Sequence, residues 1–189
     1  MSAPLPPEYE LSFLVGEVAR DDVFVESEAR VLWRVLHEAE LVGEMQRDFG
    51  RLIPQVRRAL HAPSVPEAFR TIAVNVLDAT LSAHRERNAL VHDQWVSLVW
   101  APGELRSART SRSRQLSDLR ECAAALKVLT WRMRGVHVIA PRWLGLVEED
   151  DVVSAADIRS WTRVAMGHIA NDPHRVVGTA GPAPMPPGL

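Results

Sequence analysis

The chain has one cysteine, Cys122, among 189 residues, so it contains neither an intrachain disulfide nor a cluster of thiolate ligands. Its net charge of −2 excludes the broad positive field of a general nucleic-acid-binding protein, and any such contact must be local. No apolar run approaches the roughly 20 residues of a membrane span. The first residues lack the basic and apolar regions of a signal peptide. We therefore expect a cytoplasmic protein with no contact to membranes.

Motifs of several common enzyme classes are also missing. The sequence has no glycine-rich phosphate loop, no His-Glu-x-x-His motif and no nucleophile elbow. Its length and its apolar fraction of 47% suffice for one substantial core. We expect one domain over residues 1–170, followed by a disordered tail over 171–189 that is rich in proline and glycine.

Helical periodicity dominates the rest of the chain. Apolar residues recur every three to four positions over about 11–39, 49–60, 67–91, 117–140 and 154–169, and each stretch predicts a helix. We expect Pro141 to stop the fourth helix. Between the third and fourth, the β-branched and aromatic run Trp95–Trp100 is followed by the turn pair Pro102-Gly103. The predicted fold is therefore an all-α bundle of four to five helices, with a short β-hairpin or flap between helices 3 and 4.

Asp22 interrupts the apolar face of the first predicted helix, next to Asp21. Acidic side chains are rarely buried without a partner, so two interpretations are open. The helix breaks or kinks there, giving two shorter helices, or Asp22 is a buried counter-ion.

The run Glu86-Arg87-Asn88-Ala89-Leu90-Val91-His92-Asp93 ends the third predicted helix. Arg87 falls on its buried side and needs an anion, because it cannot lose its charge. The candidates are Asp22, Asp21, Glu26, Glu28 or a bound phosphate. Arg87 and His92 diverge by about 140° on an ideal helix. They converge only if the helix ends near His92, or if they meet the side chains of a second copy across a two-fold axis.

This Arg-polar-x-x-x-His pattern, at the end of a long helix in an all-α chain, resembles the HEPN superfamily. Asn88 matches the polar residue preferred after the arginine, and Glu86, Asp93 and Trp95 resemble its usual flanks. The resemblance implies a homodimer with paired motifs in a cleft, and metal-independent cleavage of RNA without a cofactor. It also implies a role as a toxin or in phage defence, with an antitoxin or defence-system protein as a possible partner. Where one branch of the family has x-Tyr after the histidine, this chain has Asp93-Gln94, so modification of a tyrosine is not expected.

If the resemblance holds, an RNA 2′-hydroxyl attacks the adjacent phosphodiester and leaves a 2′,3′-cyclic phosphate, and DNA is inert. His92 acts as general base or acid, since its ordinary pKa is near 6.5. Arg87 holds the phosphate, and Asn88 orients His92 or the phosphate. Asp22 and Asp93 are auxiliary candidates. Alternatively, Arg87 and His92 form a structural pair, and the dimer binds RNA, a nucleotide or a protein without cleaving it.

Four arginines, Arg106, Arg109, Arg112 and Arg114, follow soon after this run. They form either an RNA-backbone grip or a solvated basic loop. Trp95 and Trp100 are available to stack on bases, although such residues are more often part of a core.

Two further Arg-to-His pairs and one group of His and Glu residues have spacings similar to those of functional motifs. Arg132/His137 and Arg163/His168 share the Arg-to-His spacing, but no polar residue follows either arginine, and we treat both pairs as background. His37, Glu40 and Glu44 have a spacing that permits one helix face and a metal site, but no matching Glu-x-x-His exists on other helices, and a solvated face explains them.

Overall fold

The computed structural model describes residues 7–93, 95–98, 101–110, 112–147 and 155–168. Five helices make up most of this part of the chain: α1 (Pro7–Glu38), α2 (Phe49–Ala59), α3 (Glu67–Val91), α4 (Leu116–Trp143) and α5 (Ala155–Ala165). The expected helical bundle with an excursion between the third and fourth helices is confirmed. The tail over 171–189 and the expected end at Ile169 lie outside the described residues.

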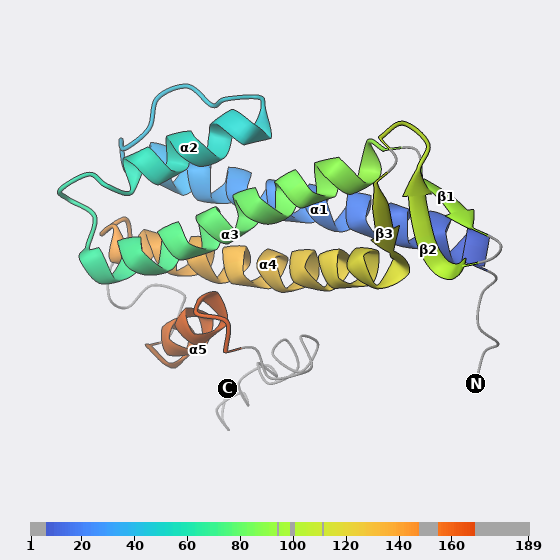
Figure 1. Cartoon of the computed structure of the whole chain (residues 1–189). Helices are drawn as coiled ribbons and strands as arrows, with labels where there is room; N and C mark the ends of the chain where they lie inside the picture. Colours follow the sequence, from blue (N-terminus) through green and yellow to red (C-terminus); the bar gives the residue numbers. More distant parts are fainter. Residues whose placement is uncertain (1–6, 94, 99–100, 111, 148–154, 169–189) are drawn as a thin grey trace, which may run out of the picture.

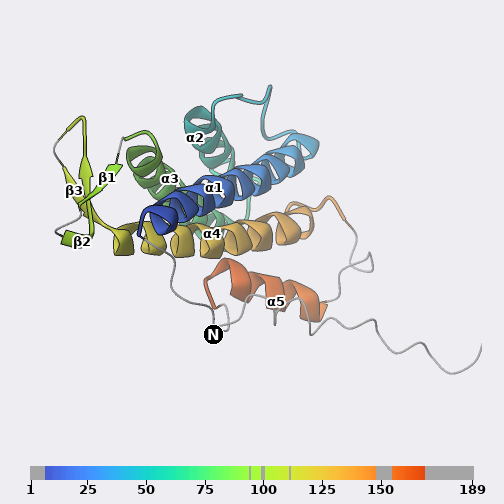
Figure 2. The same cartoon turned by 90° about the vertical axis from the view of Figure 1, so that its right-hand side faces the viewer.

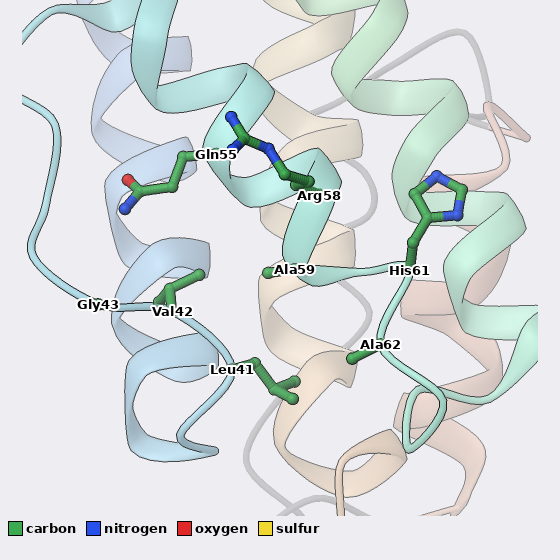
Figure 3. A pocket seen from close by; sticks show the side chains of 8 residues that line it. All are labelled: Leu41, Val42, Gly43, Gln55, Arg58, Ala59, His61 and Ala62. Atoms are coloured by element: carbon green, nitrogen blue, oxygen red, sulfur yellow. The ribbon is translucent and has the colours of Figure 1, made fainter.

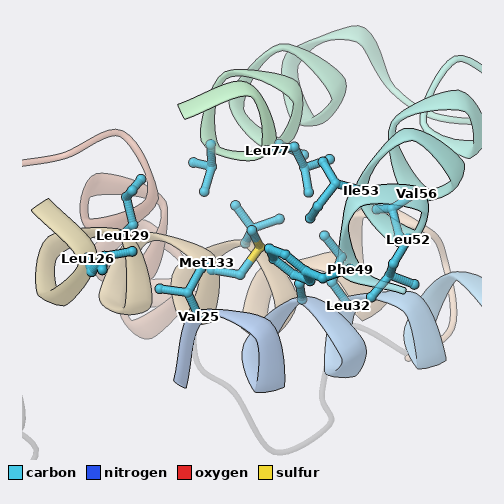
Figure 4. Packing of buried hydrophobic residues seen from close by; sticks show 14 of the residues in the cluster. Val25, Leu32, Phe49, Leu52, Ile53, Val56, Leu77, Leu126, Leu129 and Met133 are labelled. Atoms are coloured by element: carbon cyan, nitrogen blue, oxygen red, sulfur yellow. The ribbon is translucent and has the colours of Figure 1, made fainter. Parts of the chain in front are cut away.

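Three long helices, α1, α3 and α4, lie side by side and give the molecule its elongated shape (Figure 1). The short helix α2 covers α1 and α3 on one side, and α5 packs against α4 on the other (Figure 2). The apolar faces of the helices meet in one buried cluster, part of which is visible in Figure 4, where Val25 and Leu32 of α1 face Leu126 and Met133 of α4. This core orients the polar residues of α1 and α3 described below.

The chain between α3 and α4 forms a small antiparallel sheet, β1 (Trp95–Leu98), β2 (Ala101–Ser107) and β3 (Ser113–Gln115), in the order β1-β2-β3. The expected hairpin is β1–β2, and the short β3 adds to it through pairs such as Leu105 with Arg114. The sheet lies at the end of the bundle where α3 stops and α4 begins (Figure 1). It therefore borders the Arg87–His92 run.

One interpretation of Asp22 and one expectation about a helix end are wrong. Helix α1 runs without a break through Asp22, so it is not divided into two shorter helices there. Helix α4 continues past Pro141 to Trp143, because proline removes only its own N–H from the helix, and the next turn still closes with Leu144 N–H donating to Ala140 O at 2.9 Å. The stop signal is Gly145, whose φ of +69° closes the helix end with Leu146 N–H donating to Pro141 O.

Helix α5 is held to α4 by a close backbone approach. A Cβ atom added at Gly135 would lie 2.9 Å from Ala165 N and 2.9 Å from Trp161 O, so only glycine leaves room for α5. Nearby, Arg132 Nε donates to Ala165 O at 3.0 Å, which satisfies a carbonyl at the end of α5. Burial lowers the pKa of Arg132.

Candidate functional site

Arg87 lies on the buried side of α3, as its position in the sequence predicts, and its side chain is 18% exposed. Its Nε atom is 3.2 Å from Oδ2 of Asp22 on α1, and Asp22 is almost fully buried. The distance is that of an ion pair, but Nε has no aligned hydrogen-bond acceptor. Of the four acids considered for this role, Asp22 is thus the one that faces Arg87.

The other three acids have different positions. Asp21 accepts from Arg20 Nε at 3.0 Å, and Glu26 pairs with Arg30. Glu28 binds the guanidinium of Arg134 and lies 3.0 Å from Nδ1 of His137. Burial by itself would raise the pKa of Glu28, but the contacts with His137 and Arg134 together outweigh it and lower that pKa.

Two further residues of α3 join Asp22 and Arg87. Asp22 accepts from His84 Nδ1, which lies 3.0 and 3.1 Å from its two carboxylate oxygens. Asn88 donates from Nδ2 to His84 Nε2 at 3.0 Å, and Arg87 donates from Nη1 to Asn88 Oδ1 at 2.7 Å. The contacts form a closed circuit, which we call the Asp22 network: Asp22, His84, Asn88 and Arg87.

His84 is a member of this network that was not predicted from the sequence. A signal was present, because His84 precedes Asn88 by four residues and so shares its side of α3. Its ring also packs edge-on against Phe49 at the start of α2, with ring centroids 4.8 Å apart. The side chain is 15% exposed, so the network lies at the border between core and solvent.

His92 does not join this network. It caps the C-terminus of α3 with φ −89° and ψ −1°, and its backbone N–H donates to Asn88 O. Because the backbone stays helical to this point, the divergence expected between Arg87 and His92 persists. The His92 side chain is exposed and makes no hydrogen bond or ion pair with any other residue the structure describes.

Asp93 faces away from the Asp22 network, toward the turn after β2. Its Oδ1 accepts from Ser107 Oγ at 2.7 Å, and its Oδ2 accepts from Thr110 Oγ1 at 3.3 Å. The Ser107 hydroxyl oxygen in turn accepts from the backbone N–H of Thr110 at 2.9 Å. Asp93 thus ties the end of α3 to the β2–β3 turn.

The four candidate RNA-binding arginines lie in different environments. Arg114 is half-buried, with Nη2 2.8 Å from Glu86 Oε1, and Arg109 Nε is 4.0 Å from Asp93 Oδ1. Arg106 and Arg112 are exposed and have no ion pair with another described residue. Arg106 and Arg112 are therefore the members available to a polyanion.

One of the two tryptophans available to stack on bases has a structural contact. Trp95 is half-buried and donates from Nε1 to Leu90 O at 2.6 Å, which satisfies a carbonyl in the last turn of α3. Trp100 lies outside the described residues.

The remaining motifs of the sequence are dispersed. Arg132 and His137 contact Ala165 and Glu28, respectively, and so act separately. Helix α1 ends at Glu38, so Glu40 and Glu44 are not on the same helix as His37, and the prediction that the three residues share one helix face is wrong.

Over the described ranges, no group of three or more His, Cys, Asp or Glu side chains is arranged to hold a metal ion. No helix in these ranges is long and apolar enough to cross a membrane.

A separate hollow of about 390 Å³ opens between the loop after α1 and the C-terminal end of α2 (Figure 3). It is lined by Leu41, Val42, Gly43, Gln55, Arg58, Ala59, His61 and Ala62. None of the residues singled out from the sequence lines it, and the Asp22 network lies toward the other end of α2, near Phe49.

Comparisons with family models, with curated proteins and with solved structures find no match for the chain.

Proposed function

We propose that the protein is a metal-independent endoribonuclease of the HEPN type, active in the cytoplasm as a homodimer and without a cofactor. One observation carries this proposal. Arg87 and Asn88 are fixed by their contacts with each other and with Asp22, and they lie about one helical turn before an exposed His92 at the end of α3. An arginine can stabilise charge on a phosphate and an exposed imidazole can transfer protons, so these groups suit phosphodiester transfer by an RNA 2′-hydroxyl.

Each residue has a defined task in this chemistry. Arg87 Nη2 contacts no acceptor among the described residues, so that edge of the guanidinium is available to a phosphate oxygen. His92 takes the proton of the 2′-hydroxyl or gives one to the leaving 5′-oxygen. Asn88 keeps the guanidinium oriented through its 2.7 Å contact with Nη1.

The divergence of Arg87 and His92 within one chain supports a site shared between two copies. In a symmetric dimer, Arg87 of one protomer and His92 of the other can face the same phosphodiester. Arg106 and Arg112, exposed on the neighbouring sheet region, would hold the flanking backbone phosphates. A role as a toxin or in phage defence, restrained or activated by a partner protein, completes the proposal.

The test is cleavage of a mixed RNA pool in EDTA by the wild type and by the Arg87→Ala and His92→Ala variants. We expect fragments with 2′,3′-cyclic phosphate ends from the wild type, and losses of about 100-fold or more in each variant. The matched controls are Arg85→Ala and His61→Ala, which remove exposed side chains of the same types elsewhere. Equal cleavage by all five proteins would refute the proposal.

Mixing the two inactive variants tests the shared site. A mixed dimer of Arg87→Ala and His92→Ala chains contains one intact site only if that site takes Arg87 from one chain and His92 from the other. We then expect the mixture to recover about a quarter of the wild-type activity, because about half of the dimers are mixed and each has one of two sites. No recovery, or a monomer by light scattering at micromolar concentration, contradicts the shared site.

A second function is favoured by one observation. Asp22 lies at ion-pair distance from Nε of Arg87, and Asn88 accepts from its Nη1. Two protein partners are expected for a structural arginine in a dimer that binds RNA, a nucleotide or a protein without cleaving it. Binding of RNA that is lost in the Arg87→Ala variant, without cleavage by the wild type, would identify this function.

A further inference from the structure

The hydrogen bonds of the Asp22 network determine which ring nitrogen of His84 carries the proton. The Nδ2 atom of Asn88, 3.0 Å from His84 Nε2, can only donate, so Nε2 must be the acceptor. The proton is then on Nδ1, which lies 3.0 Å from Asp22 Oδ1 and donates to it. His84 is therefore neutral, with its proton on the nitrogen that faces Asp22.

The orientation of the Asn88 amide is determined as well. A guanidinium has no acceptor, so the atom of Asn88 that lies 2.7 Å from Arg87 Nη1 must be the oxygen. Rotating the amide by 180° would place its NH₂ group against Arg87 and its oxygen against the acceptor of His84. Neutral His84 with its proton on Nδ1 is thus the form that allows Asn88 to hold Arg87.

We propose that His84 is the positioning residue for Arg87, and that it acts only in its neutral form with the proton on Nδ1. This inference rests on the proposed function, because it concerns the arginine assigned to the phosphate. A second proton on His84 puts a donor on Nε2, opposite the Asn88 donor. Asn88 must then turn away, and Arg87 loses the contact at Nη1. The neutral ring is thus the form of His84 in which Arg87 keeps its contact with Asn88.

His84 has neighbours on α1, α2 and α3. Asp22 from α1 contacts the ring directly, and Arg87 on α3 reaches it through Asp22 and Asn88. The thiol of Cys122 on α4 lies close to the charges of Asp22 and Arg87. Helix α2 places the Phe49 ring against His84.

The test is nitrogen-15 NMR of the histidine rings in the full chain at neutral pH. We expect His84 to show a protonated Nδ1 and an unprotonated Nε2. In the Asn88→Asp variant, a carboxylate oxygen replaces the donor opposite Nε2, and we expect His84 to take a second proton. The exposed ring of His61 serves as the internal reference in both spectra. A proton on Nε2 of His84 in the wild type would overturn the inference.

Two substitutions at position 84 separate positioning from packing. His84→Gln retains an acceptor for Asn88 and a donor for Asp22, whereas His84→Ala removes both. We expect the Nε–H proton of Arg87 to stay protected from solvent exchange in His84→Gln and to lose that protection in His84→Ala. Circular dichroism checks that both variants are folded. Equal protection in all three proteins means that His84 does not position Arg87.

Activity provides the link to the proposed function. We expect His84→Ala to lower kcat by about 10- to 100-fold, as losses of supporting contacts commonly do, with little change in KM. His84→Gln should retain most of the activity, because it keeps an acceptor for Asn88 and a donor for Asp22. If the wild type cleaves no RNA, the proposed function fails, while the NMR and exchange results still decide whether His84 positions Arg87.

Discussion

Asp22 and Arg87 join α1 to α3 through an ion pair in which Oδ2 lies 3.2 Å from Nε, and their side chains are only 4% and 18% exposed. A pair at this depth is costly to break from one side, because the remaining charge stays in a poorly solvated position. The contact therefore links the stability of the bundle to the arginine that we assign to phosphate binding.

Replacing Asp22 by Asn should destabilise the protein. The change removes the charge that faces Arg87, and we expect the free energy of unfolding to fall by about 3 kcal/mol, the low end for buried pairs, because Arg87 still reaches solvent. Urea denaturation measures this change. Glu26→Gln is the control, since its pair with Arg30 on the same helix is more exposed, and it should cost less than about 1 kcal/mol. Equal losses in both variants would contradict the role of burial.

Adding one methyl group at Gly135 should separate α5 from α4. The new Cβ would lie 2.9 Å from two backbone atoms of α5, and overpacking of this kind costs about 1–3 kcal/mol. Amide hydrogen exchange should show faster exchange in α5 of Gly135→Ala and unchanged rates in α1. Gly16→Ala is the matched control, because nothing lies within 4 Å of its Cβ, and it should stabilise α1 by about 0.5–1 kcal/mol.

Cys122 should react slowly with alkylating reagents. Burial, followed by the nearby charges of Glu86 and Asp22, raises the pKa of this thiol from 9.0 to about 11. Because the thiolate is the nucleophile, the alkylation rate should keep rising from pH 9 to pH 11, whereas in urea it should level off near pH 9. A plateau near pH 9 in the folded protein would show that the thiol is not shielded.

The same shift predicts a loss of stability in alkali. Since the folded pKa lies above the unfolded value, the stabilisation by the neutral thiol is fully present below pH 9 and is lost as the pH rises toward 11. Between pH 9 and pH 11 the wild type should therefore lose stability relative to the Cys122→Ala variant. Thermal unfolding at several pH values measures the difference, and a constant difference contradicts the assignment.

Glu28 should contribute to stability at neutral pH but not in acid. Its contacts with His137 and Arg134 lower its pKa below the ordinary value of 4.5, so its contribution is present above pH 4.5 and is lost as the pH falls through the lowered pKa. Urea denaturation of the wild type and Glu28→Gln should show a less stable variant at pH 7 and converging stabilities in strong acid. A difference that persists in acid would point to packing instead.

The sequence predicts the helices well because their apolar periodicity is long and regular. It predicts less well how they end: Pro141 indicates a stop, but a proline in the last turn removes a single hydrogen bond, and the helix ends at the positive φ of Gly145. Asp22 left two interpretations open, since a buried acid on a helix needs a partner that only the packing of α1 on α3 brings close.

The role of His84 was harder to predict. Its spacing from Asn88 is visible in the sequence, but its significance depends on the rotamers of four side chains from two helices. The Arg87–His92 pattern shows the reverse case, because the motif is evident in the sequence while the two side chains diverge in one chain. Local spacing predicts which face a residue occupies, and tertiary contacts decide which neighbour it meets.

The circuit of three hydrogen-bonded contacts and one ion pair also constrains how this chain can change during evolution. Each member of the Asp22 network has a partner whose hydrogen-bonding type is the complement of its own, so a replacement at one position leaves a neighbour with the wrong partner. Substitutions at positions 22, 84, 87 and 88 should therefore accompany one another. Related chains should keep all four residues together or exchange them as a set, most simply for an apolar packing of similar volume.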